Sequence, residues 1–344
     1  MEFFYVIKIL FLTALSSIVA VLWTPLLTHF LYKYRLGKSI RNNGTTPIFT
    51  SLHKNKEGTP TMGGLMIWVT VLVLALVFFY AAKFIDLEFF RQLNFLTRSQ
   101  TLLPLGSLVA AALVGLTDDI LDVRGRGKGG MRIRQRIILY TLIAAVGALW
   151  FFYKLDWDLL HIPFVGNFQI GWWYIPIFIF IIVATSFSVN QIDGLDGLAG
   201  GTLLTAFGAY GAIAFVQGKY DLAAFCGVII GALIAFLWFN IKPARFFMGD
   251  TGAMSLGVTL GIIAMLTNQA LLLPIIGMLF VVAALSSIIQ ILSKKLRGKK
   301  VFLSSPLHHH LEAIGWPEYK IVMRFWLISG VTSVIGFILF LLDK

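Results

Sequence analysis

The chain has 344 residues, of which 58% are hydrophobic and only 13% are charged. Soluble globular domains carry about 25% charged residues, and a soluble core of this length does not hide 30 Phe and 9 Trp side chains. The composition therefore excludes a soluble protein and predicts an integral membrane protein. The net charge of +12 does not indicate nucleic-acid binding, because positive-inside topology and anionic lipids explain basic residues that flank apolar segments.

Ten apolar stretches are long enough to cross a lipid bilayer as helices, which takes about 17–25 residues each. The fifth and eighth are the shortest, so nine spans is the alternative to ten. We predict a single all-α membrane domain over residues 1–344, with one small external hairpin near 160–172 around Gly166 and Asn167. The predicted spans are 4–32, 62–82, 101–121, 135–153, 172–189, 197–216, 222–241, 251–267, 271–293 and 321–342.

Lys and Arg residues predict the orientation of these spans. They occur in threefold excess on one side of the spans, and such an excess marks the cytosolic side. Both termini are therefore expected on the external side, and the consistent alternation favours the even count of ten. The predicted cytosolic loops are 33–61, 122–134, 190–196, 242–250 and 294–320.

Two adjacent acids follow the third span. The segment LTDDILD (116–122) places Asp118 and Asp119 at the carboxyl end of that helix. The helix dipole disfavours anions there, and neighbouring carboxylates repel one another. A divalent cation or a lysine would remove this conflict. The alternative is a solvated helix end without a chemical role.

A second acidic group lies in NQIDGLDGLAGG (190–201), between the fifth and sixth spans. Asp193 and Asp196 precede a helix, so either could cap it. Capping explains one of these acids, but not both together with Asn190. Gly194 allows a close approach of the backbone to a ligand. This segment is therefore a candidate binding loop.

A third group lies in NIKPARFFMGDTGAMSLG (240–257), between the seventh and eighth spans. Asp250 opens a helix, so capping of that helix is one interpretation. A helix amino terminus is also a natural anion site, and Asn240, Lys242 and Arg245 add donors for a polar or charged substrate. The sequence leaves both interpretations open.

Two further loops carry polar residues. SSPLHHHLEAIGW (304–316) contains three consecutive His residues. Consecutive residues do not share one face, so a zinc site formed by all three is not favoured. Contact of the imidazoles with phosphate or uracil groups is a better interpretation. An exposed polar turn is the alternative. HKNKEGTPTMGG (53–64) is rich in Gly, Pro and Thr next to Lys56, but it lacks the spacing of a Walker loop.

Together these loops place carboxylates, cations and glycine-rich turns at one membrane surface. Mg²⁺ binds one or two carboxylates together with substrate phosphate oxygens, and phosphoryl transfer needs a metal and positioned cations. The residues therefore predict Mg²⁺-dependent phosphoryl transfer to or from a membrane lipid. A transporter is the alternative from another class, but transporters place their acids near the midplane, and the spans 62–82 and 222–241 have no ionisable residue there.

Five motifs, in this order, resemble the phospho-N-acetylmuramoyl-pentapeptide transferases of the polyprenyl-phosphate N-acetylhexosamine-1-phosphate transferase superfamily: GTPTMGG, LTDDILD, NQIDGLDGLAGG, NIKPARFFMGDTGAMSLG and SPLHHHLEAIGW. The resemblance covers nearly the whole chain. It implies transfer from UDP-N-acetylmuramoyl-pentapeptide to undecaprenyl phosphate, with Mg²⁺, giving lipid I and UMP. It also implies a homodimer in the bacterial inner membrane with a cytosolic active site. A sister enzyme that transfers N-acetylglucosamine-1-phosphate is the closer alternative.

The resemblance also assigns roles to residues. It makes Asp118, Asp119 and Asp250 catalytic, with Asp250 binding Mg²⁺ and Asp118 accepting a proton from the lipid phosphate. Asp193 is a further candidate acid near the metal. The expected substrate-binding residues are Lys56, Thr61, Asn190, Asp193, Gly194, Leu195, Asp196, Asn240, Phe247, His308, His309 and His310. A covalent phospho-enzyme and direct attack are both open; we expect direct attack, because a phosphate monoester is already mostly dianionic at neutral pH.

Overall fold

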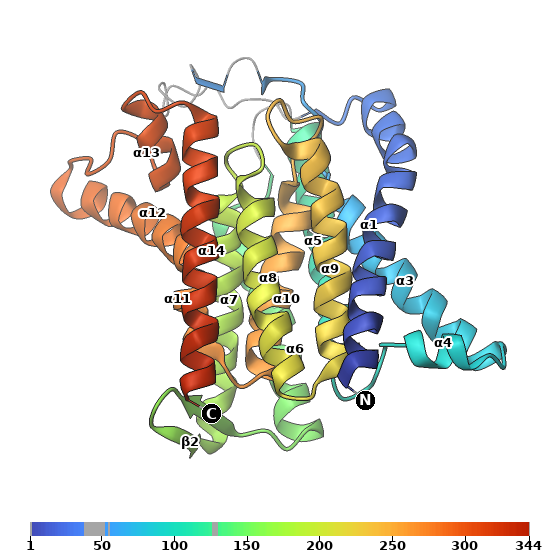
Figure 1. Ribbon diagram of the computed structural model, residues 1–344. Helices are drawn as coiled ribbons and strands as arrows, with labels where there is room; N and C mark the ends of the chain where they lie inside the picture. The colour runs from blue at the N-terminus through green and yellow to red at the C-terminus, as the bar shows by residue number, and fades with distance from the viewer. Residues whose placement is uncertain (1, 38–51, 54–55, 126–129, 344) are drawn as a thin grey trace.

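The computed structural model describes residues 2–37, 52–53, 56–125 and 130–343. Within these ranges, ten helices are long and apolar enough to cross a membrane, which confirms the all-α membrane fold and favours ten spans over nine (Figure 1). They are α1 (Glu2–Lys33), α3 (Leu65–Phe84), α5 (Leu102–Arg124), α6 (Ile133–Lys154), α7 (Tyr174–Ile192), α8 (Leu198–Val216), α9 (Tyr220–Asn240), α10 (Gly249–Leu266), α12 (Met278–Arg297) and α14 (Glu318–Leu342). Shorter helices are α4 (Glu88–Leu93), α11 (Leu273–Ile276) and α13 (Leu307–Ala313).

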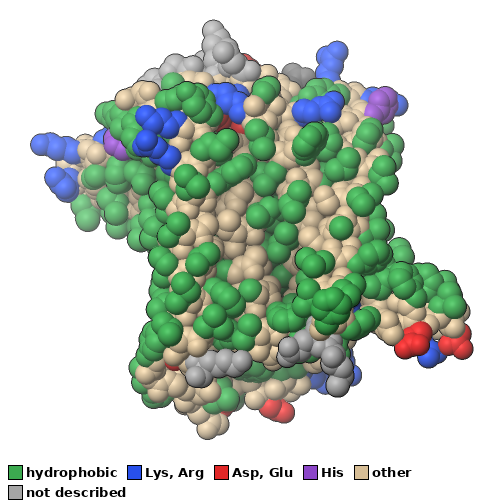
Figure 2. Space-filling view, in the orientation of Figure 1, with side chains coloured by type: hydrophobic (Ala, Val, Ile, Leu, Met, Phe, Trp, Pro, Cys, Tyr) green, Lys and Arg blue, Asp and Glu red, His purple; other side chains and the backbone are tan. Residues whose placement is uncertain are grey.

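The two chain ends lie at the same end of the bundle (Figure 1). The opposite end carries α13 and the segments that follow α1, α7 and α9; we call it the loop end. Lys and Arg side chains gather there on the visible face (Figure 2). The shared side of the termini agrees with an even number of spans. That the loop end faces the cytosol stays a prediction, as does the division into one domain.

The ninth span differs from its prediction as one helix over 271–293. The structure breaks it into α11 and α12 at Gly277, whose backbone is not helical. Pro274 stands at the start of α11, where proline is well tolerated. Basic residues extend α12 to Arg297, where they meet the negative end of the helix dipole. In Figures 1 and 2 this helix leans out from the bundle.

The predicted hairpin is present, but its turn was placed wrongly. Strands β1 (Leu159–Ile162) and β2 (Gly166–Gln169) pair antiparallel, so Gly166 and Asn167 lie in a strand. The turn is Pro163–Val165, closed by a 3.0 Å hydrogen bond from the Val165 N–H to the Ile162 carbonyl. Proline suits the second position of such a turn because its ring fixes φ.

Helix α10 forms the centre of the bundle and packs against α5 and α7. Every one of its residues except Asp250 is buried. Helix α5 approaches α10 closely at Gly115, where any side chain would collide with the Asp250 carbonyl. Helix α10 is therefore enclosed by its neighbours, and Asp250 is its one residue that is partly exposed.

Candidate active site

The first turn of α10 is capped by a residue of another helix. The Asp119 carboxylate accepts hydrogen bonds from the backbone N–H groups of Asp250 and Thr251, each 3.0 Å long, and from the Thr61 hydroxyl at 3.3 Å. The first N–H groups of a helix have no partner within it, so Asp119 supplies one from α5. Gly249 lacks a side chain that would block this approach.

This arrangement corrects one interpretation of the sequence. Asp250 was a candidate cap of its own helix, but its side chain makes no capping hydrogen bond. It turns instead toward Asn190, whose side-chain amide donates to Asp250 Oδ1. Asp196 was likewise a candidate cap of α8, yet its side chain bonds to Lys56 and to the Ala244 N–H. Both acids are therefore available for roles other than capping.

Arg136 connects the acids at the centre of the site. Its Nε pairs with Asp118 Oδ2, and its Nη2 lies 2.9 Å from Asp250 Oδ2. Its Nη1 also reaches Asn190 Oδ1 at 3.4 Å. Asp118 is fully buried, so this guanidinium supplies the positive charge that a buried carboxylate requires. The sequence had predicted such a cation beside the acid pair, as a metal or a lysine.

The donor set at this point fits a hard divalent cation. Asp118 and Asp250 already converge on one positive group, Arg136, and Asn190 adds an amide oxygen nearby. Carboxylate and amide oxygens are ligands that Mg²⁺ accepts, usually one or two of them together with water and phosphate oxygens. Asp250 is the more accessible of the two acids, with a side chain that is 17% exposed.

A second charged group surrounds Lys56. Its ammonium pairs with Asp196 Oδ1 at 2.7 Å and with Glu318, and it lies 6.0 Å from the centre of the Phe247 ring. Glu318 is buried; it also pairs with Lys242 at 2.8 Å and accepts the Asp196 N–H at 2.9 Å. Glu318 thus links Lys56 to the backbone of Asp196, and these two residues belong to different loops.

Two of the expected substrate-binding residues, Asn240 and Phe247, hold loops together. Asn240 is buried; its oxygen accepts the Gly197 N–H at 2.9 Å, and its amide donates to the Phe246 carbonyl at 2.7 Å. Phe247 joins the GTPTMGG loop through backbone hydrogen bonds to Pro60 and Gly63. Leu195 is buried as well. These contacts explain how loops distant in sequence form one surface.

The histidine motif lies beside the DGLDG loop. His308 is fully buried and His309 nearly so, and a side chain at Gly194 would collide with both imidazoles. His310 is set apart, with its Nδ1 accepting the Leu303 N–H at 3.3 Å. Gly194 therefore allows the binding loop to approach two of the three histidines.

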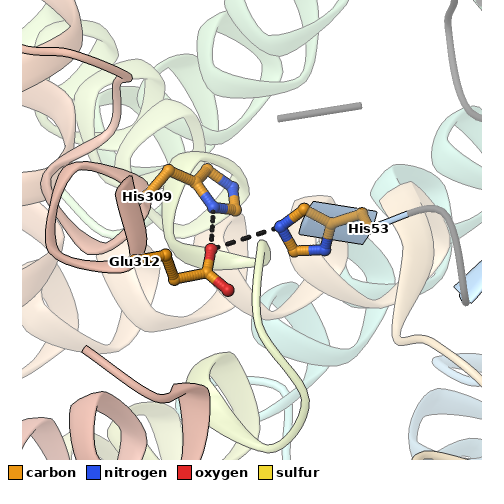
Figure 3. A group of neighbouring side chains, drawn as sticks. All are labelled: His53, His309 and Glu312. Carbon is orange, nitrogen blue, oxygen red and sulfur yellow. Dashed lines mark hydrogen bonds and ion pairs between the residues drawn. The ribbon is translucent and has the colours of Figure 1, made fainter. Parts of the chain in front are cut away.

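Glu312 joins the histidine motif to the segment that precedes Lys56. Its Oε2 lies 2.7 Å from His309 Nδ1 and 3.2 Å from His53 Nε2 (Figure 3). Burial would raise the pKa of Glu312, but the hydrogen bonds from His309 and His53 outweigh it and lower the pKa to about 2. Burial lowers the pKa of His309 and, more strongly, that of His308. Glu312 is therefore ionised at neutral pH beside a neutral His309.

The structure brings most of the predicted residues into these three groups. Asp118, Asp119, Asp250, Asn190 and Thr61 form the first, and the Lys56 group and the histidine group follow. Asp193 ends α7 and is partly exposed.

The sequence interpretation missed three members of the groups. Arg136 had counted only among the basic residues that predict the orientation, and neither Glu318 nor His53 had been singled out. The one sequence signal for Arg136 is its place in the first turn of a span, where its side chain remains close to the loop end.

A ten-span bundle with clustered acids and cations at one end is a polytopic membrane protein with a polar site at that end, and comparison with known proteins places it among the transferases. Residues 101–268 match the glycosyl transferase family 4 model, and residues 56–67 match signature 1 of the phospho-N-acetylmuramoyl-pentapeptide-transferases. Transferases of that name from Chloroflexus aggregans and Geobacillus thermodenitrificans are 41% and 40% identical, covering 96% and 94% of this chain and 88% and 95% of their own length. The one from Bacillus subtilis is 38% identical over 95% of this chain and 96% of its own.

The chain belongs to the phospho-N-acetylmuramoyl-pentapeptide-transferase family. The resemblance drawn from the five motifs is thereby confirmed. The signature covers Lys56 and Thr61, and the broader family model spans the first acid pair, the DGLDG loop and Asp250.

Proposed function

We propose that this protein transfers phospho-N-acetylmuramoyl-pentapeptide from its UDP-linked precursor to undecaprenyl phosphate, giving lipid I and UMP. Family membership supports the reaction. The observation that carries the proposal is the convergence of Asp118, Asp250 and Asn190 on the guanidinium of Arg136 at the loop end of a membrane bundle. A site there can receive a water-soluble nucleotide from one side and a lipid phosphate from the bilayer.

The excess of Lys and Arg at the loop end supports a cytosolic active site and periplasmic termini in a bacterial inner membrane. The soluble nucleotide substrate would then be met on the side where the cell makes it. The homodimer implied by the family resemblance is also part of this proposal. Native mass spectrometry of the purified protein would test it, because a single chain mass at working concentration contradicts a dimer.

Asp250 would hold Mg²⁺, with Asp118 and Asn190 beside it. The ion, when bound, would neutralise charge on the diphosphate and on the leaving UMP. Asp118 would face the lipid phosphate and take the proton from the fraction that arrives protonated. Arg136, which offsets the two acids in this structure, would remain as a cation for phosphate oxygens. Lys56, beside Phe247, would position the nucleotide.

The proposed reaction is a direct displacement. An oxygen of undecaprenyl phosphate forms a bond to the phosphorus that carries the sugar, and the bond from that phosphorus to the bridging oxygen breaks, so UMP leaves with the electron pair. The phosphate nucleophile is mostly dianionic at neutral pH, so a base contributes little and positioning dominates. Incubation with the nucleotide substrate and no lipid should leave the aspartates unmodified; mass spectrometry that finds a phosphorylated aspartate overturns direct attack.

Substrate choice gives the first prediction. Purified protein with undecaprenyl phosphate and Mg²⁺ should release UMP from UDP-N-acetylmuramoyl-pentapeptide and release it at background rate from UDP-N-acetylglucosamine. UMP release from the second nucleotide alone would favour the sister activity. UMP release from neither would contradict a transferase. Omission of the lipid is the control, because hydrolysis of the nucleotide would also yield UMP.

Glu318 gives the second prediction. The change Glu318→Gln keeps an oxygen for the Asp196 N–H but removes the charge that pairs with Lys56 and Lys242. We expect KM for the nucleotide to rise about tenfold, or about 1.4 kcal/mol, with kcat changed little, because Glu318 positions Lys56 and touches no reacting atom. Glu88→Gln on α4 is the matched control. A fall in kcat at constant KM would contradict the positioning role.

A further inference from the structure

Three side chains beside the carboxylates of the first group form a cluster of their own: His53, His309 and Glu312 (Figure 3). His309 and Glu312 lie three residues apart on α13 and so project from one face of that helix. His53 joins them from the segment before Lys56. One ligand atom from each lies within 4.8 Å of the other two. All three side chains are between 5% and 9% exposed, so they form a buried cluster.

The spacing of these atoms is close to that of a metal site. Glu312 Oε2 is 3.2 Å from His53 Nε2 and 2.7 Å from His309 Nδ1. In a tetrahedral zinc site, bonds of about 2.0–2.1 Å separate neighbouring ligand atoms by about 3.3 Å. Both measured distances lie within about 0.6 Å of that value, so the ligand atoms would separate only slightly to admit an ion.

The chemistry of the ligands selects the kind of ion. Two imidazole nitrogens and one carboxylate are a recurrent ligand set for zinc, with a fourth position left for water. Imidazole suits zinc and its neighbours in the transition series, whereas Mg²⁺ prefers oxygen ligands throughout. We propose that His53, His309 and Glu312 bind a zinc-type dication, at a site separate from the carboxylates of Asp118 and Asp250.

This proposal revises the interpretation of the histidine run. Three consecutive histidines do not share a face, which argues against zinc at His308, His309 and His310 together. In the structure only His309 contributes from that run, and the second imidazole comes from His53. The bound ion would tie the segment that leads to Lys56 to α13. If the proposed function holds, that link would fix one wall of the nucleotide site.

Zinc binding is testable without any substrate. Full-length protein in detergent, purified without a metal-affinity step and stripped with a chelator, would be titrated with Zn²⁺ against a fluorescent indicator in excess Mg²⁺. We expect one Zn²⁺ per chain. His53→Ala and Glu312→Ala should each weaken binding by about a hundredfold or more. His310→Ala is the matched control from the same helix and should bind as the wild type does.

A second measurement uses the wild type alone and tests the proposal even if the variants fail to fold. X-ray absorption on the zinc-loaded wild type should show two imidazole ligands with Zn–N bonds of about 2.0–2.1 Å. The proposal is overturned if the stripped wild type takes up no zinc, because the cluster is then only hydrogen-bonded. It is also overturned if His310→Ala weakens binding as much as His53→Ala, because the histidine run is then the ligand. Neither result bears on the transferase activity, since no nucleotide or lipid is present.

Discussion

Asp250→Asn should lower kcat by about a thousandfold or more, because a bound metal contributes several kcal/mol of charge stabilisation in phosphoryl transfer. Asn keeps the size of the side chain and one oxygen, but it loses the charge by which Asp250 would hold Mg²⁺ in the proposed function. The measurement is UMP release from UDP-N-acetylmuramoyl-pentapeptide at saturating lipid and Mg²⁺. Asp250 is the one residue of α10 that is not buried, so the effect on packing should be small.

Thermal stability separates loss of chemistry from loss of fold in this variant. Arg136 remains paired with Asp118, so Tm should stay within a few degrees of the wild type. Asp86→Asn is the control, since that carboxylate is exposed beside Arg91. Activity of Asp250→Asn within about tenfold of wild type would exclude Asp250 as the metal anchor, because the loss of a charged ligand to a catalytic metal costs more than that.

The sequence predicted the membrane architecture well because its two strongest signals are physical requirements. A span needs a minimum apolar length, and Lys and Arg are unequally distributed across a membrane. The ten spans followed from the apolar lengths. The placement of both termini on one side followed from the apolar lengths together with the distribution of Lys and Arg. The errors fell where local geometry overrides composition. Gly277 interrupts a continuous apolar run, and Pro163 sets a hairpin turn three residues before the Gly166 that had suggested it.

For the candidate site, the acids were predictable and their partners were not. Asp118, Asp119 and Asp250 are conspicuous because a helix end or a glycine-rich loop at a membrane surface has few structural uses for several carboxylates. Their partners come from other spans. Arg136 and Glu318 each lie in the first turn of a helix, and in the sequence such charges only mark the end of a span. Which charges meet is decided by helix packing, and hydrophobic periodicity does not encode it.

The sequence identified Asp119 as a site residue, but it did not predict the hydrogen-bond partners of that residue. The family resemblance groups it with Asp118 as catalytic, but its two oxygens accept the N–H groups of Asp250 and Thr251. Asp119→Asn would turn an amide NH₂ toward at least one of these donors. Loss of a cap costs about 1 kcal/mol, and a buried N–H without a partner costs about 1–3 kcal/mol more. We therefore expect a Tm lowered by several degrees, unlike in Asp250→Asn.

Activity of Asp119→Asn should also fall, by about a hundredfold, because displacement of a reacting group by about 1 Å has effects of that size and Asp250 stands in the turn that Asp119 caps. Thr61→Val is the graded control for stability: it removes one 3.3 Å hydrogen bond to Asp119 and leaves the cap in place, so it should have a small effect on Tm. Activity lost in Asp119→Asn at an unchanged Tm would contradict the positioning role. Asp119 would then act on substrate or metal directly, and the capping hydrogen bonds would be incidental to its function.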